Sequence, residues 1–412
     1  SLPSLRFGRT YRFRAHTVDL AGNSLPFGDE LLVNGSGPTS PDVVHRRFDP
    51  IEQPAVLLRR PRTEGETVER VVIRTDPDLP PSAVTPAERH IAPPRTSQLT
   101  AEQHGLFDID GRLDHGLYTT LCRRDAFTLA NSPQATVEPS GPGDPDGVPA
   151  SVYYDLDAID IRYLTDPLAA GVLLRDVPGA PDGRLVVPFT RIGDRWPDRR
   201  SVRLRLIEGT GAPTVVDSAT GAIVTIQVPK GSTNVVRYNS WMDPATPGLE
   251  NLLGVLTFLE LGPPESAANT RATILRSEAW MVTPYRELTL VSASRRPVLE
   301  PKLASLVATR SVGSTVATLT ATLTRHRPST ARIEVMANWT DHVDPGLPLD
   351  TYPSMAAALA APGPTTVSAR ARAFEVPVGS SDEPAAGDVQ RADLRHDLGD
   401  TRHRSVTYTP VA

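Results

Sequence analysis

The stretch Val316–Leu323, which reads VATLTATL, alternates apolar and polar side chains with a period of two. Such alternation directs one set of side chains into a core and the other into water, as in a half-buried β-strand. Similar short runs recur along the chain: Arg70–Thr75 (RVVIRT), Ser201–Ile207 (SVRLRLI), Ala222–Val228 (AIVTIQV), Glu287–Ser292 (ELTLVS) and Ala331–Ala337 (ARIEVMA). The recurrence predicts a mainly β fold.

Turn-forming residues separate these runs. The 412 residues include 41 prolines and 29 glycines, which leaves little room for long helices. Short strands with frequent turn signals are typical of β-sandwiches and barrels. We therefore predict tandem β-sandwich modules, joined by proline- and glycine-rich linkers, with few short helices. The helix candidates are residues 100–105, with Thr100 as the N-cap, and residues 166–174, 249–261 and 354–361.

The N-terminal residues form a recognisable pattern. Arg9–Arg14 (RTYRFR) is an aromatic-centred strand candidate, and Asp19–Asn23 (DLAGN) follows it closely. A strand followed by D-x-x-G-N resembles the penultimate strand and closing turn of a fibronectin type III or immunoglobulin-like module. Gly22 and Asn23 suit the positive backbone dihedrals of a hairpin turn. The resemblance implies that the earlier strands of this module precede Ser1, or that the hairpin joins another sheet.

Composition shifts predict four regions, with boundaries near residues 45, 150 and 300. Residues 1–45 would end an immunoglobulin- or fibronectin III-like module, and residues 46–150 would form an extended, loop-rich segment with short strands. Residues 151–300 would form a sandwich-like domain with one or two short helices. Residues 301–412 hold five strand candidates and would form an immunoglobulin- or fibronectin III-like sandwich. Asp76–Pro81 (DPDLPP) and Pro139–Pro149 (PSGPGDPDGVP) are predicted linkers or surface loops.

Charge and cysteine content exclude several classes of protein. The formal net charge is only -5, which argues against a nucleic-acid binder with a basic face. Of the 43 basic residues only Lys230 and Lys302 are lysines. Cys122 is the single cysteine, so a disulfide within the chain and a cysteine metal cluster are both excluded. The sequence contains no stretch of 18 apolar residues, so we predict no membrane span.

One polar cluster in the sequence invites a metal-site interpretation. It comprises Glu102, His104, Asp108, Asp110, Asp114 and His115. Zinc and calcium both take ligands of these types, and His104, Asp108, Asp110 and His115 are the candidate ligands. The spacing matches no known metal motif, and Arg112 stands where a calcium loop beginning at Asp108 needs an acceptor. A solvated loop is the competing interpretation.

Two further features are compatible with carbohydrate chemistry. Asp155, Asp157 and Asp160 follow two tyrosines, and paired carboxylates near aromatic rings are what a glycosidase uses. The same alternation also places Asp155 and Asp157 on the solvent face of a strand. Trp241 and Trp339 are candidate sugar-binding platforms, with core packing as the alternative. The sequence contains no G-x-S-x-G elbow, P-loop or G-x-G-x-x-G.

Several phrases, taken in order, resemble a family of large bacterial proteins associated with loci for phage-tail-like contractile injection particles. They are His45–Pro50 (HRRFDP), Glu88–Pro94 (ERHIAPP), Gln103–Asp108 (QHGLFD), Tyr163–Gly171 (YLTDPLAAG), Trp280–Val291 (WMVTPYRELTLV) and Asp400–Tyr408 (DTRHRSVTY). The family supplies no established chemistry, so the resemblance assigns no functional residue. The chain departs from the pattern at Ser292–Ser294, where a histidine-valine-glutamine phrase is expected.

The resemblance implies a structural role in a secreted or particle-associated protein, at an extracellular or particle-associated location. We therefore expect a non-enzymatic structural or adhesive β-sandwich protein, a fragment of a larger bacterial chain, with no cofactor unless zinc or calcium binds. The expected partners are other protein subunits or further domains of the larger chain, and glycans, but not nucleic acid. One alternative is a metal-dependent or carbohydrate-active hydrolase with a site within residues 88–160. Another alternative is a carbohydrate-binding module.

Overall fold

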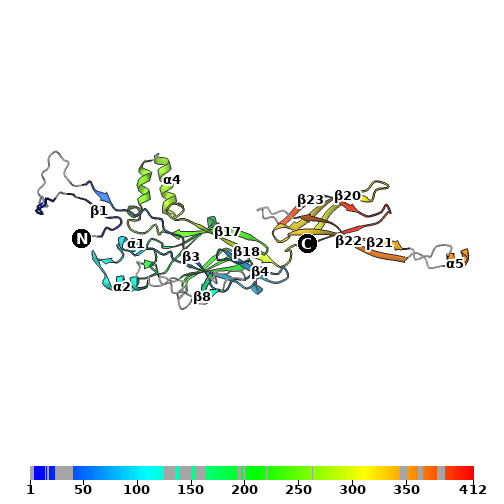
Figure 1. Ribbon diagram of the computed structural model, residues 1–412, viewed down its shortest axis with the longest axis horizontal. Coiled ribbons are helices and arrows are strands. Elements are labelled where there is room, and N and C mark those ends of the chain that lie inside the picture. The colour runs from blue at the N-terminus through cyan, green and yellow to red at the C-terminus, as the bar shows by residue number, and fades with distance from the viewer. Residues whose placement is uncertain are drawn as a thin grey trace. The chain divides into compact units, whose positions relative to one another are not determined.

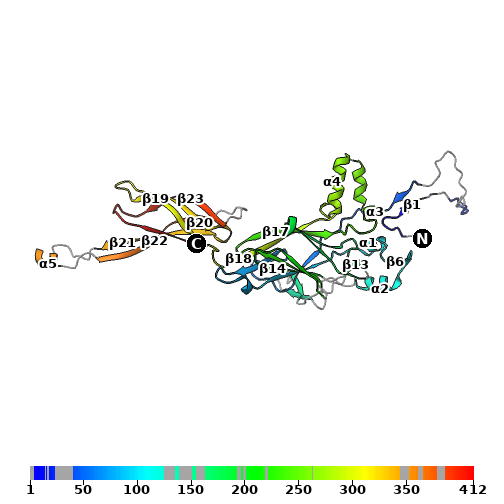
Figure 2. The same cartoon turned by 180° about the vertical axis from the view of Figure 1, so that it is seen from behind.

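The computed structural model divides the chain into two compact units (Figures 1 and 2). Unit 1 comprises residues 1–72, 86–228 and 234–290, and unit 2 comprises residues 73–85, 229–233 and 291–412. The structure describes residues 4–13, 15, 18–23, 40–124, 135–138, 151–154, 163–192, 196–197, 201–218, 221–261, 263–343, 351, 353–360, 365–377 and 386–412. Strand residues outnumber helical residues, 41% against 15%, which confirms the prediction of a mainly β fold.

The largest sheet of unit 1 has seven strands in the order β15-β16-β14-β5-β3-β9-β8. Their bounds are β3 Ala55–Leu58, β5 Ala87–Ala92, β8 Ala135–Glu138, β9 Ser151–Tyr154, β14 Val202–Glu208, β15 Thr214–Val216 and β16 Ile223–Val228. The sheet is mixed: β14 pairs in parallel with β16, and β3 with β9, whereas the other neighbours are antiparallel. β14 and β16 bury every second residue, as the period-two pattern predicts.

A second sheet has five strands in the order β11-β10-β17-β18-β4. Their bounds are β4 Arg70–Thr75, β10 Gly171–Arg175, β11 Arg184–Pro188, β17 Thr233–Trp241 and β18 Arg286–Ser294. β10 is antiparallel to both β11 and β17. Gly171 lies where β11 comes closest, because a Cβ there would stand 2.5 Å from the carbonyl oxygen of Val187. Only glycine allows this approach of the two backbones.

The helix predicted over residues 166–174 is wrong, because residues 171–175 form β10. Pro167 and the acidic Asp166 suggest a helix start, and one carboxylate oxygen of Asp166 does accept a hydrogen bond from the backbone N–H of Leu168, at 3.0 Å. The chain turns there instead of continuing as a helix. Residues 171–174 are buried as a continuous apolar run, and such a run fits a strand covered on both faces as well as a buried helix.

The helices of unit 1 are short. They are α1 Gln98–Gln103, α2 His115–Arg124, α3 Leu249–Leu252, the 3₁₀ helix η4 Gly254–Leu261 and α4 Pro264–Leu275. α1 begins earlier than predicted, because the side-chain oxygen of Ser97, and not Thr100, caps it by accepting from the backbone N–H of Thr100 at 3.1 Å. The helix predicted over residues 249–261 is broken at Leu253, which has extended backbone angles.

The remaining small elements connect these parts. They are β1 Thr10–Tyr11, β2 Val43–Val44, β6 Asp108–Ile109, β7 Arg112–Leu113, β12 Arg191–Ile192 and β13 Trp196–Pro197, with 3₁₀ turns η1 Pro81–Ala83, η3 Pro181–Gly183 and η5 Arg327–Ser329. The predicted N-terminal strand is limited to β1, which pairs with β2. The turn at Asp19–Asn23 is present: the carboxylate of Asp19 accepts from the backbone N–H groups of Ala21 and Asn23, and Gly22 has a φ of 86°.

Unit 2 contains two three-stranded antiparallel sheets, β19-β20-β23 and β22-β21-β24. Their bounds are β19 Lys302–Thr309, β20 Val316–His326, β21 Arg332–Val343, β22 Thr365–Pro377, β23 Ala386–Asp397 and β24 Thr407–Val411, and α5 spans Met355–Leu359. Leu319 and Leu323 of the first sheet share one apolar core with Ile333, Val335 and Val376 of the second. The sequence predicts five of these strands, and β19 is the one it misses.

Candidate functional site

A buried polar cluster of unit 1 is centred on Arg47, which is buried together with Asp166. The two side chains are 3% and 2% exposed, and the guanidinium binds both carboxylate oxygens, at 2.8 and 2.6 Å. The other N–H groups of Arg47 contact Nε2 of His104 at 3.0 Å and the carbonyl oxygens of Asp49 and Pro50 at 3.1 and 2.8 Å. All five donors of the guanidinium are therefore used. We call Arg47, Asp166 and His104 the arginine node.

Backbone hydrogen bonds tie distant segments to the arginine node. The N–H of Asp166 donates to the carbonyl of Pro94 at 2.9 Å, which joins residues 163–171 to the end of β5. The N–H of Arg47 donates to Leu252 and its carbonyl accepts from Gly254, at 2.8 and 2.7 Å. The node thus fastens four stretches of chain that are far apart in the sequence.

His104 is neutral in this arrangement. Burial lowers its pKa to about 4; the positive charge of Arg47 also lowers it, while the carboxylate of Asp166 acts in the opposite direction. Because Arg47 donates to Nε2, the ring proton lies on Nδ1. The ring of Phe7 meets His104 edge-on at 5.0 Å between centroids and stacks on His45 at the same distance. His104 therefore accepts a hydrogen bond inside the protein.

Strand β5 carries a second buried charge network. Burial by itself would raise the pKa of Glu88, but hydrogen bonds from Arg203, Arg205 and Arg59 outweigh it and lower the pKa to about 2. The contacts from Arg203 and Arg205 are both 2.8 Å long. Next to it, Arg89 binds buried Glu66 at 3.2 Å and four backbone carbonyl groups. Burial would also raise the pKa of Glu66, but hydrogen bonds from Thr63 and the charge of Arg89 outweigh it and lower the pKa, so both carboxylates stay ionised.

Two of the four candidate metal ligands have partners of their own. His104 belongs to the arginine node, and the carboxylate of Asp108 binds Arg6 at 2.9 Å. Asp110 lies exposed in the turn between β6 and β7 with a φ of 49°, and His115 lies exposed at the start of α2. Among the described residues, no three His, Cys, Asp or Glu side chains gather as a metal site would require. The zinc or calcium site stays a prediction.

Asp114 and Glu102, the other acidic members of the predicted cluster, have local roles. Asp114 accepts from the backbone N–H groups of Gly116 and Leu117, at 2.9 and 3.1 Å, and so caps α2. Glu102 accepts from the hydroxyl of Tyr118 at 2.8 Å. The hydrogen bond between Glu102 and Tyr118 thus joins α1 to α2.

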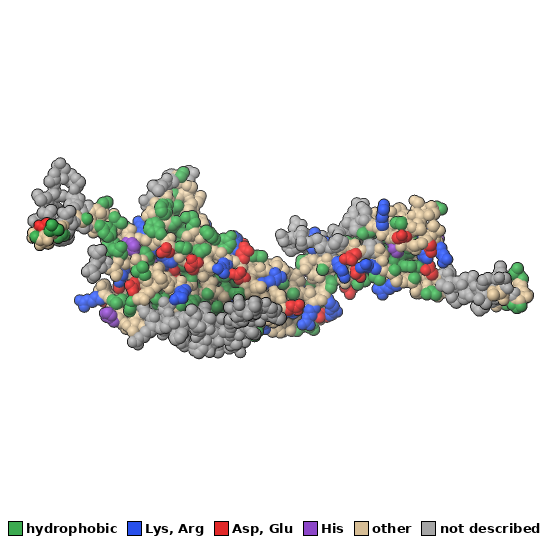
Figure 3. Space-filling view, in the orientation of Figure 1, with side chains coloured by type: hydrophobic (Ala, Val, Ile, Leu, Met, Phe, Trp, Pro, Cys, Tyr) green, Lys and Arg blue, Asp and Glu red, His purple; other side chains and the backbone are tan. Residues whose placement is uncertain are grey.

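The tryptophans differ in exposure. Trp241, at the end of β17, and Trp339, in β21, are both half-buried. Nε1 of Trp339 donates to Asp341 at 3.0 Å, and the guanidinium of Arg404 lies 5.8 Å from the ring centre. Trp196 is buried, whereas Trp280 is 64% exposed. Met281, which follows Trp280, is 70% exposed. Figure 3 shows hydrophobic side chains gathered over the region of α4.

Part of the predicted carbohydrate chemistry cannot be placed. Asp155, Asp157 and Asp160 lie outside the described residues, and so does the predicted loop Pro139–Pro149. Cys122 lies in α2. In the region proposed for a hydrolase site, residues 88–160, partners within unit 1 hold four of the six polar side chains of the predicted cluster, whereas Asp110 and His115 are exposed.

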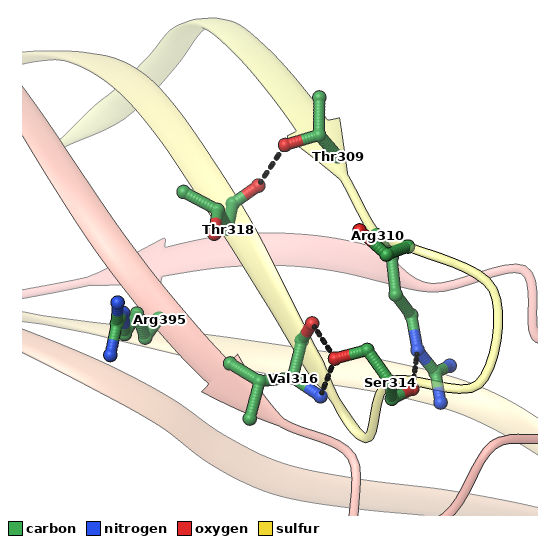
Figure 4. A pocket seen from close by; sticks show the side chains of 7 residues that line it. Thr309, Arg310, Ser314, Val316, Thr318 and Arg395 are labelled. Atoms are coloured by element: carbon green, nitrogen blue, oxygen red, sulfur yellow. Dashed lines mark hydrogen bonds between the residues drawn. The ribbon is translucent and has the colours of Figure 1, made fainter.

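Unit 2 carries a polar hollow of about 420 Å³ on its first sheet (Figure 4). It is lined by Thr309, Arg310, Ser311, Ser314, Val316, Thr318 and Arg395. The register of the sheet sets Thr309 opposite Thr318, and Thr318 opposite Arg395, so one row crosses β19, β20 and β23. All three side chains of the row are exposed, because the neighbouring Ala317 and Leu319 face the core. We call this site the β20 hollow.

The turn between β19 and β20 forms one wall of the β20 hollow. The hydroxyl of Ser314 accepts from the N–H of Val316 at 3.1 Å and donates to its carbonyl at 3.0 Å. Arg310 folds back over the turn and donates to the carbonyl oxygens of Ser314, Arg402 and Asp400, the first two at 2.7 and 3.0 Å. The guanidinium of Arg310 is therefore held in place by backbone atoms.

Comparisons with family models, with curated proteins and with solved structures find no match for this chain. Within the described part of the chain, none of the helices has the length and apolar character that a membrane crossing requires.

Proposed function

We propose that this chain is a non-enzymatic structural or adhesive protein, built from β-sandwich modules of the immunoglobulin or fibronectin III type. The observation that supports this most directly is unit 2, where two antiparallel sheets contribute Leu319, Leu323, Ile333, Val335 and Val376 to one core. Two sheets over a shared core are the architecture of such modules. Modules of this kind serve as rigid spacers that present their surfaces to partners, although the fold alone does not assign a function.

The chemistry of unit 1 is in keeping with a structural role. Its clustered charges are engaged by one another; they are buried at the arginine node, and around Glu88 the carboxylate is buried while its arginine partners are partly exposed. A catalytic acid or base must reach a proton of the substrate, whereas Nε2 of His104 already faces Arg47. These groups stabilise the packing of segments that are distant in sequence.

We further propose that the chain is part of a larger secreted or phage-tail-like particle-associated protein. Five of the six phrases that resemble the contractile-injection family meet in unit 1, and the sixth, Asp400–Tyr408, lies in unit 2. Arg47, His104 and Asp166 come from three of the five. A fourth joins through Pro94, and a fifth through the hydrogen bond from Ile51 to Val282, at 2.8 Å. Their convergence on one structure supports treating them as a single pattern.

A co-sedimentation experiment tests this proposal. Contractile particles are purified from a strain in which the gene for this chain is deleted, and the purified chain of 412 residues is added back. We expect saturable co-sedimentation at a fixed ratio to the particle subunits, and no turnover of glycan or peptide panels. Particles stripped of their sheath, and an unrelated β-sandwich protein of similar size, serve as controls. Failure to sediment with the particles, or multiple-turnover hydrolysis, would contradict the proposal.

A further inference from the structure

We infer that the β20 hollow binds an anionic saccharide through Arg395, Arg310 and the row of hydroxyl groups between them. This inference rests on the adhesive part of the proposed function and names the ligand class that such adhesion would use. It is carried by the side chains that line the hollow in Figure 4.

Among the described residues, no carboxylate neutralises the two positive charges in the hollow. Arg395 is exposed and has no hydrogen-bond or ion-pair partner among the described residues. Arg310 donates three of its N–H groups to carbonyl oxygens, and none of its contacts in the described part of the chain is with a carboxylate. Two of its five N–H groups therefore remain for a ligand. Guanidinium groups bind carboxylates and phosphates through paired, charge-assisted hydrogen bonds, so the hollow is complementary to an anion.

The space between these charges suits a hydroxyl-rich molecule. The hydroxyl of Thr318 points from the middle strand, β20, and has no partner among the described residues. Thr309 and Ser311 are also exposed and lie on the β19 side of the hollow. Hydroxyl groups both donate and accept, which matches the hydroxyl groups of a sugar. Val316 is the one apolar residue of the described lining, so an apolar ligand would leave the guanidinium of Arg395 and the hydroxyl of Thr318 unpaired.

The geometry of the hollow also favours a saccharide over a bare ion. A volume of about 420 Å³ lies within the range of small-molecule sites, roughly 300–1,000 Å³. A phosphate or sulfate ion would leave most of that space to water. A ligand that reaches from β19 to β23 can meet the hydroxyl row and the guanidinium groups at once.

Direct binding to the purified full chain tests the inference. Titration calorimetry would compare an oligogalacturonate, the neutral galacto-oligosaccharide of the same length, and inorganic phosphate. We expect the oligogalacturonate to bind at one site per chain, at least tenfold more tightly than the neutral sugar. Its affinity should fall as salt is added, because the ion pairs are exposed.

Three single substitutions test whether the oligogalacturonate binds in the β20 hollow. Arg395→Ala should weaken oligogalacturonate binding about tenfold or more, because it removes a charged hydrogen-bond donor. Thr318→Val keeps the shape of the side chain and should weaken binding by a smaller factor, about threefold to fivefold. Arg370→Ala, an exposed arginine in β22 on the other sheet, is the matched control and should leave binding unchanged. Circular dichroism confirms that each variant is folded.

Each other outcome would overturn the inference. Absence of binding, equal affinity for the neutral sugar, or loss of binding in Arg370→Ala would remove the hollow as an anionic saccharide site. Phosphate binding at the same affinity as the oligogalacturonate would identify a simple anion site. The assay is independent of particle attachment, so co-sedimentation without sugar binding would contradict only this inference. Sugar binding without co-sedimentation would contradict only the particle-associated part of the proposed function.

Discussion

Unit 1 and unit 2 handle their charged residues in opposite ways. In unit 1 the ion pairs Arg47–Asp166 and Arg89–Glu66 are buried on both sides, with no side chain more than 3% exposed. In unit 2 the carboxylates of the described ion pairs are at least partly exposed, as in the cross-strand cluster formed by Arg372 and Glu375. Figure 3 shows positive and negative side chains interspersed over the surface of unit 2.

The difference reflects how each unit acquires a specific structure. Unit 2 has long strands with a period of two, so alternation alone assigns each side chain to the core or to water. Unit 1 assembles short strands and irregular segments from distant parts of the chain. In unit 1, buried ion pairs can select one arrangement of the segments. Any arrangement that leaves a buried charge without its partner is disfavoured by several kcal/mol.

The largest effect is expected from Asp166→Ala. The change leaves the buried guanidinium of Arg47 without its carboxylate, so the free energy of unfolding of unit 1 should fall by about 3–5 kcal/mol. Urea unfolding followed by tryptophan fluorescence measures it, because Trp196, Trp241 and Trp280 all lie in unit 1.

Two controls accompany Asp166→Ala. Glu250→Gln removes an ion pair with Arg271 that is exposed on both sides, and should cost less than about 1 kcal/mol. The double variant Arg47→Met, Asp166→Leu should recover much of the loss, because it removes both charges. If Asp166→Ala costs no more than Glu250→Gln, the arginine node does not determine the stability of unit 1.

An intermediate effect is expected from pH, through His104. Its folded pKa of about 4 lies below the ordinary value of 6.5, so the unfolded chain binds more protons between these values. The contribution of neutral His104 to the free energy of unfolding is complete above pH 6.5 and is lost as the pH falls toward 4. Between pH 7 and pH 5 the wild-type protein should lose about 2 kcal/mol more than His104→Gln, whose side chain keeps an acceptor for Arg47.

Urea unfolding of both proteins at pH 7, 6 and 5 measures this difference. Parallel pH dependences for the wild type and His104→Gln would show that the histidine is not held neutral. His115→Gln is the matched control, because His115 is exposed, and its pH dependence should follow that of the wild type.

The smallest effect is expected in unit 2. Glu375→Gln removes the carboxylate that contacts Arg372 at 3.4 Å and Arg332 at 3.7 Å, and the side chain of Glu375 is 38% exposed. We expect the free energy of unfolding to change by less than about 1 kcal/mol, and by less still in high salt. Unfolding followed through the fluorescence of Trp339 measures it. A loss as large as that in Asp166→Ala would remove the distinction between the two units.

Sequence patterns predicted the secondary structure correctly where neighbouring residues alone determine it. The β-branched run Arg70–Thr75 and the period-two alternation in Val316–Leu323 correspond to β4 and β20, and the DLAGN turn forms. The pattern was insufficient for Gly171–Arg175, because a buried apolar run of this length fits a helix or a strand equally well. Strand β19 was missed because LASLVA, within Lys302–Thr309, does not alternate strictly.

The candidate sites were harder to predict, because the residues that contact the candidate side chains are distant in the sequence. His104 and Asp108 looked like members of one metal cluster, since they lie four residues apart. The partners that decide their roles are Arg47 and Arg6, and Asp108 is 102 residues from Arg6. The hydroxyls of Thr309 and Thr318 become part of a site only when the register sets them beside Arg395.

The sequence by itself determined that this protein is mainly β, with short helices and with a C-terminal group of strands that alternate between core and surface. Alternation and turn residues act over a few neighbouring positions, so they can be interpreted without the fold. The tertiary structure alone decided which charges are buried together and where hydroxyls and arginines share a surface. Arg47 meets Asp166 across 119 residues, and only the folded chain brings such groups within hydrogen-bond distance.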